Sequence, residues 1–156
     1  MLELSQYCEY RQEKACSSLA TMDNYVSTEN MLPNKAGISK ASSIPSTGKL
    51  AVFKKGDVLV SNIRPYFKKI WLADFDGFCS NDVLVLKTKS NCNSEYLYFL
   101  LSDDRFFSYA TKTAKGTKMP RGDKASIMGY LVWNLLKIGT VFRNEWDSKL
   151  LRGGTL

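Results

Sequence analysis

Nine residues, Gly116 to Lys124, combine the residue types that best fit a defined chemistry in this chain. They contain three cations, two glycines and one proline. Glycine and proline at these positions favour a loop over a continued helix. A loop that carries lysine and arginine beside a rigid element is suited to holding a polyanion, because its cations neutralise phosphates. The charge pattern alone is equally compatible with a solvated surface loop.

A second basic stretch, residues 61–69, adds residue types that could read DNA bases. Recognition of a DNA sequence needs Lys or Arg on phosphates, for affinity and register, and polar side chains on base edges, for specificity. In this stretch Pro65 stiffens the connection that presents its neighbours. In the loop at 116–124, Thr117 and Arg121 could reach bases, while the lysines suit phosphates. The candidate DNA-binding residues are Asn62, Arg64, Tyr66, Lys68, Lys69, Lys112, Lys115, Thr117, Lys118, Arg121 and Lys124.

Two of these candidates have an alternative structural role of equal weight. Arg64 could form a salt bridge with an acid at the edge of the core, such as Asp57. Asn62 could be a turn residue whose side chain caps its own backbone. The residue types by themselves do not separate these roles from contacts with DNA.

The net charge of +7 is concentrated in two blocks. Residues 1–34 carry two cations and five acids, residues 35–69 eight cations and one acid, and residues 105–124 six cations and one acid. If the fold brings the two basic blocks together, they form one positive face, which is typical of a nucleic-acid binder. A membrane surface would also attract such a face, but the sequence has no basic amphipathic helix with a clean apolar side.

Missing residue types exclude several kinds of catalytic site. The chain has no histidine, which excludes Ser-His-Asp and Cys-His nucleophile systems and histidine-ligated metals. It contains neither of the glycine-rich motifs that cradle nucleotide phosphates. The neighbouring carboxylates Asp103 and Asp104 fall in a helix-like stretch, where adjacent side chains diverge, and fit a solvated face better than a catalytic pair. We therefore expect no catalysis by this chain, and neither a cofactor nor a metal.

Size and cysteine usage indicate one globular domain inside the cell. The chain has 156 residues, 44% of them hydrophobic, which suits one domain with a buried core. It lacks an apolar run of the roughly 20 residues that span a membrane, and its first residues lack the pattern of a signal peptide. The four cysteines are far apart in the sequence, so we expect free thiols in a reducing cytoplasm.

Short strands and one helix are predicted to position the basic residues. Short β-branched and aromatic runs, broken by Gly, Pro and Asn, indicate a compact, mostly antiparallel twisted sheet. The segment from Glu95 to about Ala114 has the spacing of one main amphipathic helix, with Ser94 as its N-cap. Its aromatic residues are expected in the core rather than on a base-stacking surface. The fold class is therefore α+β. Strands are predicted within residues 25–32, 50–53, 57–61, 69–73, 82–86 and 138–142.

Several motifs occur together in the order in which they occur in a known protein family. They are Tyr25–Met31, Gly56–Trp71, Ser80–Val85 and the loop Gly116–Arg121, which follows the predicted helix. Together they closely resemble a target recognition domain of the specificity subunits of type I restriction-modification systems. The resemblance runs from about residue 4 to residue 132, and the shared order makes it stronger than any single motif.

This resemblance implies a DNA-reading module without catalysis of its own. Such domains are similar to the small recognition domain of some DNA methyltransferases, and each reads one half of a split, asymmetric target through the major groove. In that family, methylation subunits bring S-adenosylmethionine and the adenine chemistry, and a separate motor subunit brings ATP-driven translocation and cleavage. This chain would supply sequence-specific binding of double-stranded DNA and so direct those partners.

The chain departs from the family pattern after residue 132. A full specificity subunit has two recognition domains separated by long helices. Here one recognition domain is expected at residues 1–132, followed by an atypical C-terminal segment at 133–156. A truncated gene, a half-subunit that forms a homodimer and a remnant all stay open. The apolar stretch from Trp133 to Phe142 supports an alternative, a non-catalytic interaction protein that docks on methylation or specificity subunits and binds DNA weakly.

Overall fold

Two strands with uninterrupted apolar runs form the centre of the fold. In β6 (Val58–Ser61) and β9 (Val83–Thr88), successive residues alternate between two buried clusters. Val58 shares a cluster with helix residues, whereas Leu59 shares one with residues of a second sheet. Because side chains of a strand point alternately to the two faces of its sheet, this uninterrupted burial means that both faces are covered.

The structure is a computed structural model that describes residues 1–132. Its central sheet has the strand order β2-β9-β6-β7 and is antiparallel throughout. Ser61 at the end of β6 lies opposite Val83 at the start of β9, so the segments that follow β6 and precede β9 leave the sheet at the same place. The outer strands are β2 (Cys8–Tyr10) and β7 (Ile70–Leu72).

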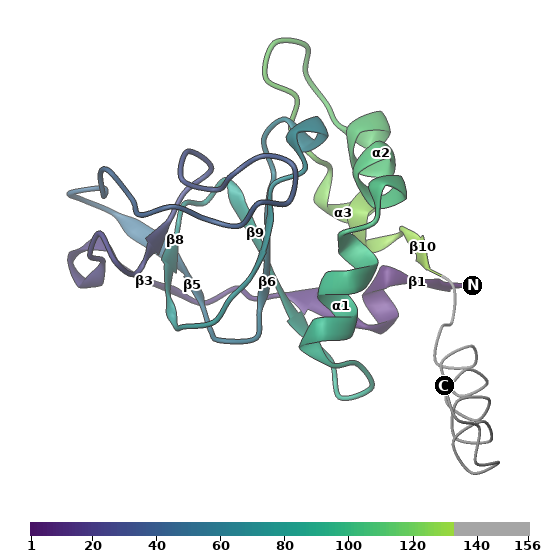
Figure 1. The fold of residues 1–156 in the computed structure, drawn as a ribbon, viewed down its shortest axis with the longest axis horizontal. Helices are drawn as coiled ribbons and strands as arrows, with labels where there is room; N and C mark the ends of the chain where they lie inside the picture. Colours follow the sequence, from purple (N-terminus) through teal and green to yellow (C-terminus); the bar gives the residue numbers. More distant parts are fainter. Residues whose placement is uncertain (133–156) are drawn as a thin grey trace, which may run out of the picture.

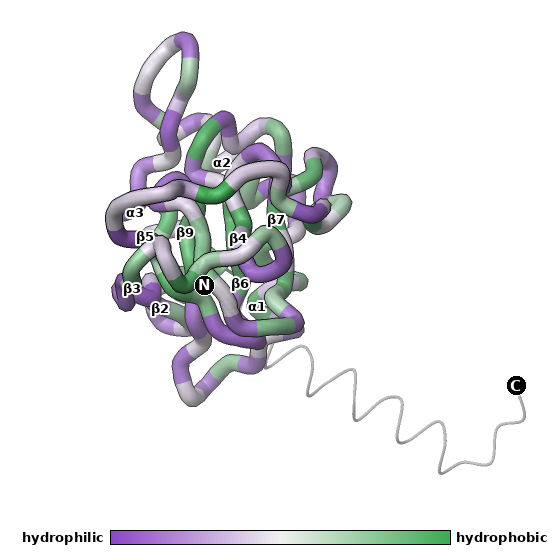
Figure 2. Tube along the Cα trace, turned by 90° about the vertical axis from the view of Figure 1, so that its left-hand side faces the viewer, coloured by the Kyte–Doolittle hydropathy of each residue, from purple (hydrophilic) through white to green (hydrophobic). Residues whose placement is uncertain are grey.

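A second four-stranded sheet, of order β3-β5-β8-β4, packs on one face of the central sheet, and the helices lie on the other side (Figure 1). Its strands are antiparallel except for β4, which runs parallel to β8. Figure 2 shows hydrophobic residues along the inner strands and hydrophilic residues on the loops. The remaining strands are β3 (Lys14–Cys16), β4 (Tyr25–Val26), β5 (Lys49–Phe53), β8 (Gly77–Cys79) and the separate pair β1 (Leu2–Glu3) and β10 (Leu131–Val132).

The one long helix that the sequence predicts is two helices, with a break at Ser102 and Asp103. In α1 the last N–H bond runs from Ser102 to the carbonyl of Tyr98, and the Ser102 hydroxyl donates to the same carbonyl. The carboxylate of Asp103 then accepts the N–H of Arg105 at 2.8 Å and starts a new helix. Side chains that bond to the nearby backbone in this way compete with helix continuation. The helices are α1 (Ser94–Leu101), α2 (Asp104–Thr113) and α3 (Lys124–Met128), and the 3-10 turns are η1 (Leu4–Gln6), η2 (Ser17–Leu19) and η3 (Pro65–Phe67).

The N-cap and one aromatic residue also differ from expectation. Asn93 caps α1 in place of Ser94, since its side-chain oxygen accepts the N–H of Tyr96 at 2.7 Å. The aromatic residues of α2 pack as expected, with Phe106 and Phe107 almost fully buried. Phe99 of α1, by contrast, is 65% exposed, because it lies on the face of α1 opposite to Leu97 and Leu101.

The predicted fold class is confirmed, with finer detail than the sequence supplied. The fold is α+β and its sheets are mostly antiparallel. The strands form two sheets, and the second sheet covers the face of the central sheet that the helices leave open. In the stretch 25–32, only Tyr25–Val26 is a strand. The predicted strand at 138–142 lies outside the described residues.

We expect Gly77→Ala to destabilise the fold by about 2–3 kcal/mol, the upper part of the usual range for overpacking. Gly77 lies in β8, where an added Cβ would clash with the carbonyl oxygen of Asn24 and lie 2.6 Å from Cζ of Phe53. Backbone atoms cannot rotate away as a side chain can. Urea denaturation measures the change in unfolding free energy.

Gly129→Ala is the matched control for that substitution. Its Cβ would come no closer than 3.4 Å to a neighbouring atom, and its φ of −84° suits any residue. An equal loss of stability in both variants would contradict the steric explanation.

We expect Asp103→Ala to lower the free energy of unfolding by roughly 1 kcal/mol at neutral pH, because it removes the cap of α2. Hydrogen bonds from the side chain and the backbone N–H of Arg105 lower the pKa of Asp103 from 3.8 to about 2. A carboxylate with a depressed pKa stabilises the fold above its unfolded-state pKa. This contribution is therefore lost as the pH falls from 3.8 toward about 2.

Denaturation at a series of pH values checks the Asp103 prediction. Asp103→Asn keeps a capping acceptor, so it should retain most of the stability at neutral pH without this pH dependence. A difference between wild type and Asp103→Ala that stays constant through the acidic range would contradict the role of the carboxylate.

Candidate nucleic-acid interface

Backbone hydrogen bonds close the basic loop into a hairpin and join it to the second basic stretch. We call residues 115–121 the hairpin loop and residues 61–69 the upstream loop. The hairpin loop is closed by two N–H···O bonds of 2.9 Å between Lys115 and Arg121. On its other side, Arg64 donates to the carbonyl of Pro120 at 2.8 Å, and Gly122 donates to the carbonyl of Asn62 at 2.9 Å. One segment of each basic block therefore belongs to the same surface, whereas Lys40 and Lys54 of the first block pair with acids elsewhere, Asp23 and Asp76.

Figure 1 shows the hairpin loop projecting beyond the sheets, next to the short turn η3 and the end of α2. Two glycines allow this arrangement. Gly116 has a φ of +101°, in the region that favours glycine. At Gly122 an added Cβ would lie 2.7 Å from Oδ1 of Asn62, so the close approach of the two loops also requires the absence of a side chain.

Four non-glycine residues with left-handed backbone gather at the upstream loop. These are all such residues in the described part of the chain: Asn34, Lys35, Arg64 and Lys68. The N–H of Asn34 donates to the carbonyl of Phe67, and the N–H of Lys35 donates to that of Lys68 at 2.7 Å. Conformations of this kind cost on the order of 1–3 kcal/mol each and persist where surrounding contacts impose them, often at functional sites. Their clustering beside the hairpin loop marks this surface independently of its charge.

The cations of this surface differ in how they are held. Lys68 lies 3.0 Å from the carboxylate of Asp104, which also binds Lys35 at 2.7 Å. Hydrogen bonds from these two lysines lower the pKa of Asp104. The ammonium of Lys69 donates to the carbonyl of Thr28 at 2.7 Å. The two ion pairs of Asp104 lie at the surface. Ion pairs at the surface are weak, so these lysines can exchange them for contacts with phosphate.

Three candidate cations have no ion pair, side-chain hydrogen bond or ring contact in the part of the chain that the structure describes: Arg64, Lys112 and Lys118. All three side chains are exposed, and Lys112 lies in the last turn of α2. Thr117, at the tip of the hairpin loop, is exposed as well. Lys115 has only a long contact of 4.0 Å with Asp123. A cation without a protein partner breaks no existing ion pair when it binds a phosphate, so these three side chains are well suited to contact a polyanion.

Arg121 and Tyr66 are presented in different ways. Arg121 lies at the root of the hairpin loop, and its Nη1 is 3.0 Å from Oδ1 of Asp82. Tyr66 is 45% exposed, and its ring meets that of Phe67 edge to face at 4.9 Å between centroids. A half-exposed aromatic ring on a basic surface offers a stacking face for a base.

One candidate is held elsewhere. Lys124 begins α3, its ammonium lies 5.8 Å from the ring centre of Tyr10 in β2, and its carbonyl accepts the Tyr10 hydroxyl at 3.0 Å. It forms no hydrogen bond or ion pair with the hairpin loop or the upstream loop. Nine of the eleven candidates therefore lie in the two joined loops, whereas Lys112 lies in the last turn of α2 and Lys124 begins α3.

Both structural alternatives considered for the upstream loop are wrong. Asp57 does not pair with Arg64, because Arg11 already binds it with Nε at 2.6 Å and Nη2 at 3.2 Å. The side chain of Asn62 does not cap its own backbone. That turn is made by the hydroxyl of Ser61, which accepts the N–H of Ile63 at 3.3 Å. Oδ1 of Asn62 is buried without a hydrogen-bond partner.

Sequence reasoning missed three residues of this surface: Lys35, Asp82 and Asp104. Lys35 belongs to the first basic block, but the stretch between it and the upstream loop gives no sign that they touch. The two acids were hidden because they lie far in sequence from the cations they bind. Asp82 falls inside one of the family motifs, which is the only signal that could have singled it out.

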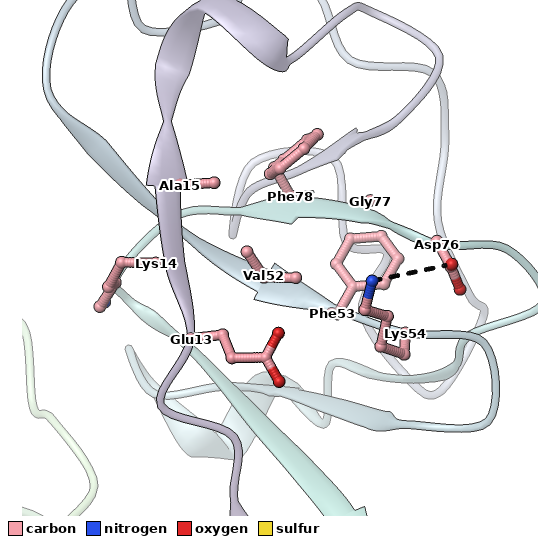
Figure 3. Close-up of a pocket in the computed structure, with 9 residues that line it drawn as sticks. All are labelled: Glu13, Lys14, Ala15, Val52, Phe53, Lys54, Asp76, Gly77 and Phe78. Atoms are coloured by element: carbon pink, nitrogen blue, oxygen red, sulfur yellow. Dashed lines mark ion pairs between the residues drawn. The ribbon is translucent and has the colours of Figure 1, made fainter.

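A separate hollow of about 450 Å³ lies over β3, β5 and β8 (Figure 3). Its charged groups already have partners, since Lys54 lies 4.0 Å from Asp76, Glu13 lies 2.8 Å from Arg11 and Lys14 donates to the side chain of Asn81. Within residues 1–132 there is no group of three or more Cys, Asp or Glu side chains that could hold a metal ion. None of the helices in the same range combines the length and the apolar character needed to cross a membrane. The surface around the hairpin loop is thus the stronger candidate site.

Comparisons with known proteins agree with this fold and with one family. No protein-family model matches the chain. The EcoDI specificity subunit of a type I restriction enzyme from Escherichia coli is 27% identical over 113 residues, which cover 67% of this chain and 25% of that protein. The chain therefore spans about a quarter of the length of this relative.

Solved structures with the same fold come from type I systems. A chain from a study of complex assembly and conformational transition of the type I R-M system superposes with a TM-score of 0.64 and 22% identity, covering 97% of this chain and 44% of that one. The HsdS subunit from Thermoanaerobacter tengcongensis gives 0.62 and 21%, with the same coverages. The S subunit from M. genitalium gives 0.53 and 16%, over 83% and 32% of the two chains. This chain thus resembles type I specificity subunits in sequence, and it has the fold of their target recognition domains.

Proposed function

We propose that residues 1–132 bind double-stranded DNA sequence-specifically, as the target recognition component of a type I restriction-modification system. The observation that carries this proposal is that backbone hydrogen bonds join the hairpin loop to the upstream loop, so that one basic segment from each block belongs to the same surface. This surface combines exposed cations for phosphates with Arg121, Thr117 and Tyr66, whose exposed side chains can contact base edges or faces. The relatives that the chain resembles are specificity subunits, which fits such a role.

In this role the chain has no catalytic residue and no cofactor of its own. Methylation and restriction subunits would catalyse the reactions on DNA, and this chain would recognise the target sequence. The complex would act in the cytoplasm. Nine of the candidate contacts belong to the upstream loop and the hairpin loop, and they are the residues to which we assign DNA binding: Asn62, Arg64, Tyr66, Lys68, Lys69, Lys115, Thr117, Lys118 and Arg121. We also assign a contact with a DNA phosphate to Lys112, which lies in the last turn of α2, just before the hairpin loop.

A docking protein with weak DNA binding is the second candidate function. The apolar stretch at 133–142 that suggested it lies outside the described residues. Within them, β1 and β10 expose Leu2 at 41% and Leu131 at 52%, which offers a small apolar surface for a partner chain. Docking and DNA reading use different surfaces, so the two functions are separated by the DNA measurement below.

Selection of bound duplexes from a random double-stranded pool, at two salt concentrations, tests the proposed function. We expect enrichment of a motif of a few base pairs and an affinity that falls steeply with salt, because bound cations displace counterions. Salt-sensitive binding without any enriched motif would contradict a target recognition role. It would favour the docking protein, which pull-down with methylation subunits would then identify.

We expect Arg121→Ala and Lys118→Ala to weaken DNA binding by about 1–3 kcal/mol where the residue reads a base. If Lys118 contacts only a phosphate, its loss should instead lower the slope of log affinity against log salt by about one. Titration of a labelled duplex at several salt concentrations measures both quantities. Lys87→Ala is the matched control. Asp82 precedes the first residue of β9, whereas Lys87 lies near the last residue of that strand and pairs with Glu9 at 3.4 Å. Unchanged affinity in both loop variants would exclude the hairpin loop as a DNA contact.

A further inference from the structure

Asp82 connects the two basic loops although its own charge is negative. It immediately precedes β9, and its carbonyl accepts the N–H of Asn62 at 2.8 Å. Its carboxylate reaches Nη1 of Arg121 at 3.0 Å. An acid at the centre of a surface that is otherwise rich in cations opposes the binding of phosphate. Its presence there therefore calls for a role other than general attraction of DNA.

The backbone of Arg121 is held on both sides, so its side chain starts from a defined position. Arg121 exchanges two hydrogen bonds with Lys115, and it forms a bridge with Ile63 of the upstream loop. The side chain is 53% exposed and that of Asp82 is 34% exposed. A pair as exposed as this contributes little to the stability of the fold. Among the described residues, Asp82 is the one acidic partner of the guanidinium, and the contact is an ion pair through Nη1 alone.

An arginine fork is the side chain that reads guanine best. Its parallel N–H groups match O6 and N7 of guanine in the major groove. A carboxylate that binds one edge of the guanidinium fixes the plane and direction of the rest, which lowers the entropy lost when the fork meets the base. Asp82 contacts the guanidinium of Arg121 through one nitrogen, Nη1, at 3.0 Å.

The surroundings of Asp82 leave the pair open to a ligand. Asp82 lies on the wall of a hollow of about 340 Å³ that Ser27, Thr28 and Ser80 also line. The protein therefore does not seal the carboxylate on that side, and the same hollow is lined by a second acid, Glu29. The hollow borders Asp82 of the pair, and Arg121 is not among the residues that line it.

We infer that Asp82 is a positioning residue for DNA recognition, which holds the Arg121 guanidinium so that it selects guanine at one base pair of the target. This inference rests on the proposed function and adds to it a residue and the identity of one base. Asp104 provides the contrast, because it also neutralises cations of this surface but binds Lys35 and Lys68 rather than Arg121.

Selection from a random duplex pool with the full chain tests the inference. The wild type should enrich a motif that contains guanine at one position. Asp82→Ala and Arg121→Ala should each reduce the preference for guanine there by roughly tenfold, within the range for one bidentate base contact. Asp82→Asn, which keeps the size and polarity of the side chain, should show a smaller loss at the same position. The double variant should lose no more than Arg121→Ala alone, because the two residues act as one unit.

Asp104→Asn is the matched control, since it removes the same charge from the same surface. It should tighten binding to all duplexes by a similar factor and leave the motif unchanged. If Asp82→Ala behaves in this way too, Asp82 only repels phosphates and the inference is wrong. A wild type that binds DNA with salt sensitivity but without any motif would instead contradict the proposed function, and this inference would fall with it. Thermal unfolding with an unchanged midpoint would show that each variant keeps its fold.

Discussion

Burial of the central sheet on both faces is the constraint on which the rest of the structure depends. The helices cover one face and the second sheet covers the other, so β6 and β9 must be apolar at successive positions and must pair in one register. That register places Ser61 opposite Val83. As a result, Asn62 and Asp82 emerge side by side, and the upstream loop begins where the hairpin loop is anchored. A slip of one residue would exchange the buried faces and separate these two loops.

The surface around the two loops contains cations that are paired with acids and cations that have no such partner. Arg121 is oriented by an acid, whereas Arg64 and Lys118 are not. Held side chains lose less freedom on binding and suit the reading of base edges, and unpartnered ones suit the mobile contacts with phosphates that give affinity. The left-handed residues around η3 serve the same arrangement, because they fix the path of the backbone that carries the cations.

Several features of the fold were predictable from local sequence. The strands at β5, β6, β7 and β9 follow from short β-branched runs broken by glycine and proline, and their mostly antiparallel pairing follows from the short connections between them. Two helices could not be told from one, because Ser102 and Asp103 fit a helix surface by pattern and break the helix only through bonds to nearby backbone. The salt bridge between Arg64 and Asp57, which was the alternative to DNA binding by Arg64, is absent for a similar reason. Asp57 pairs instead with Arg11, which lies 46 residues away in the sequence.

The sequence by itself determined the fold class, the concentration of charge in two blocks, the residue types of the hairpin loop and the resemblance to a family. These depend on composition and on periods of a few residues, which local steric and hydrophobic preferences set. Only the tertiary structure decided which residues of the two blocks meet, that Asp82 and Asp104 lie among the cations, and that Lys124 lies apart. The reason is physical: such contacts depend on the register of buried strands and on hydrogen bonds between segments tens of residues apart, and local preferences carry no information about either.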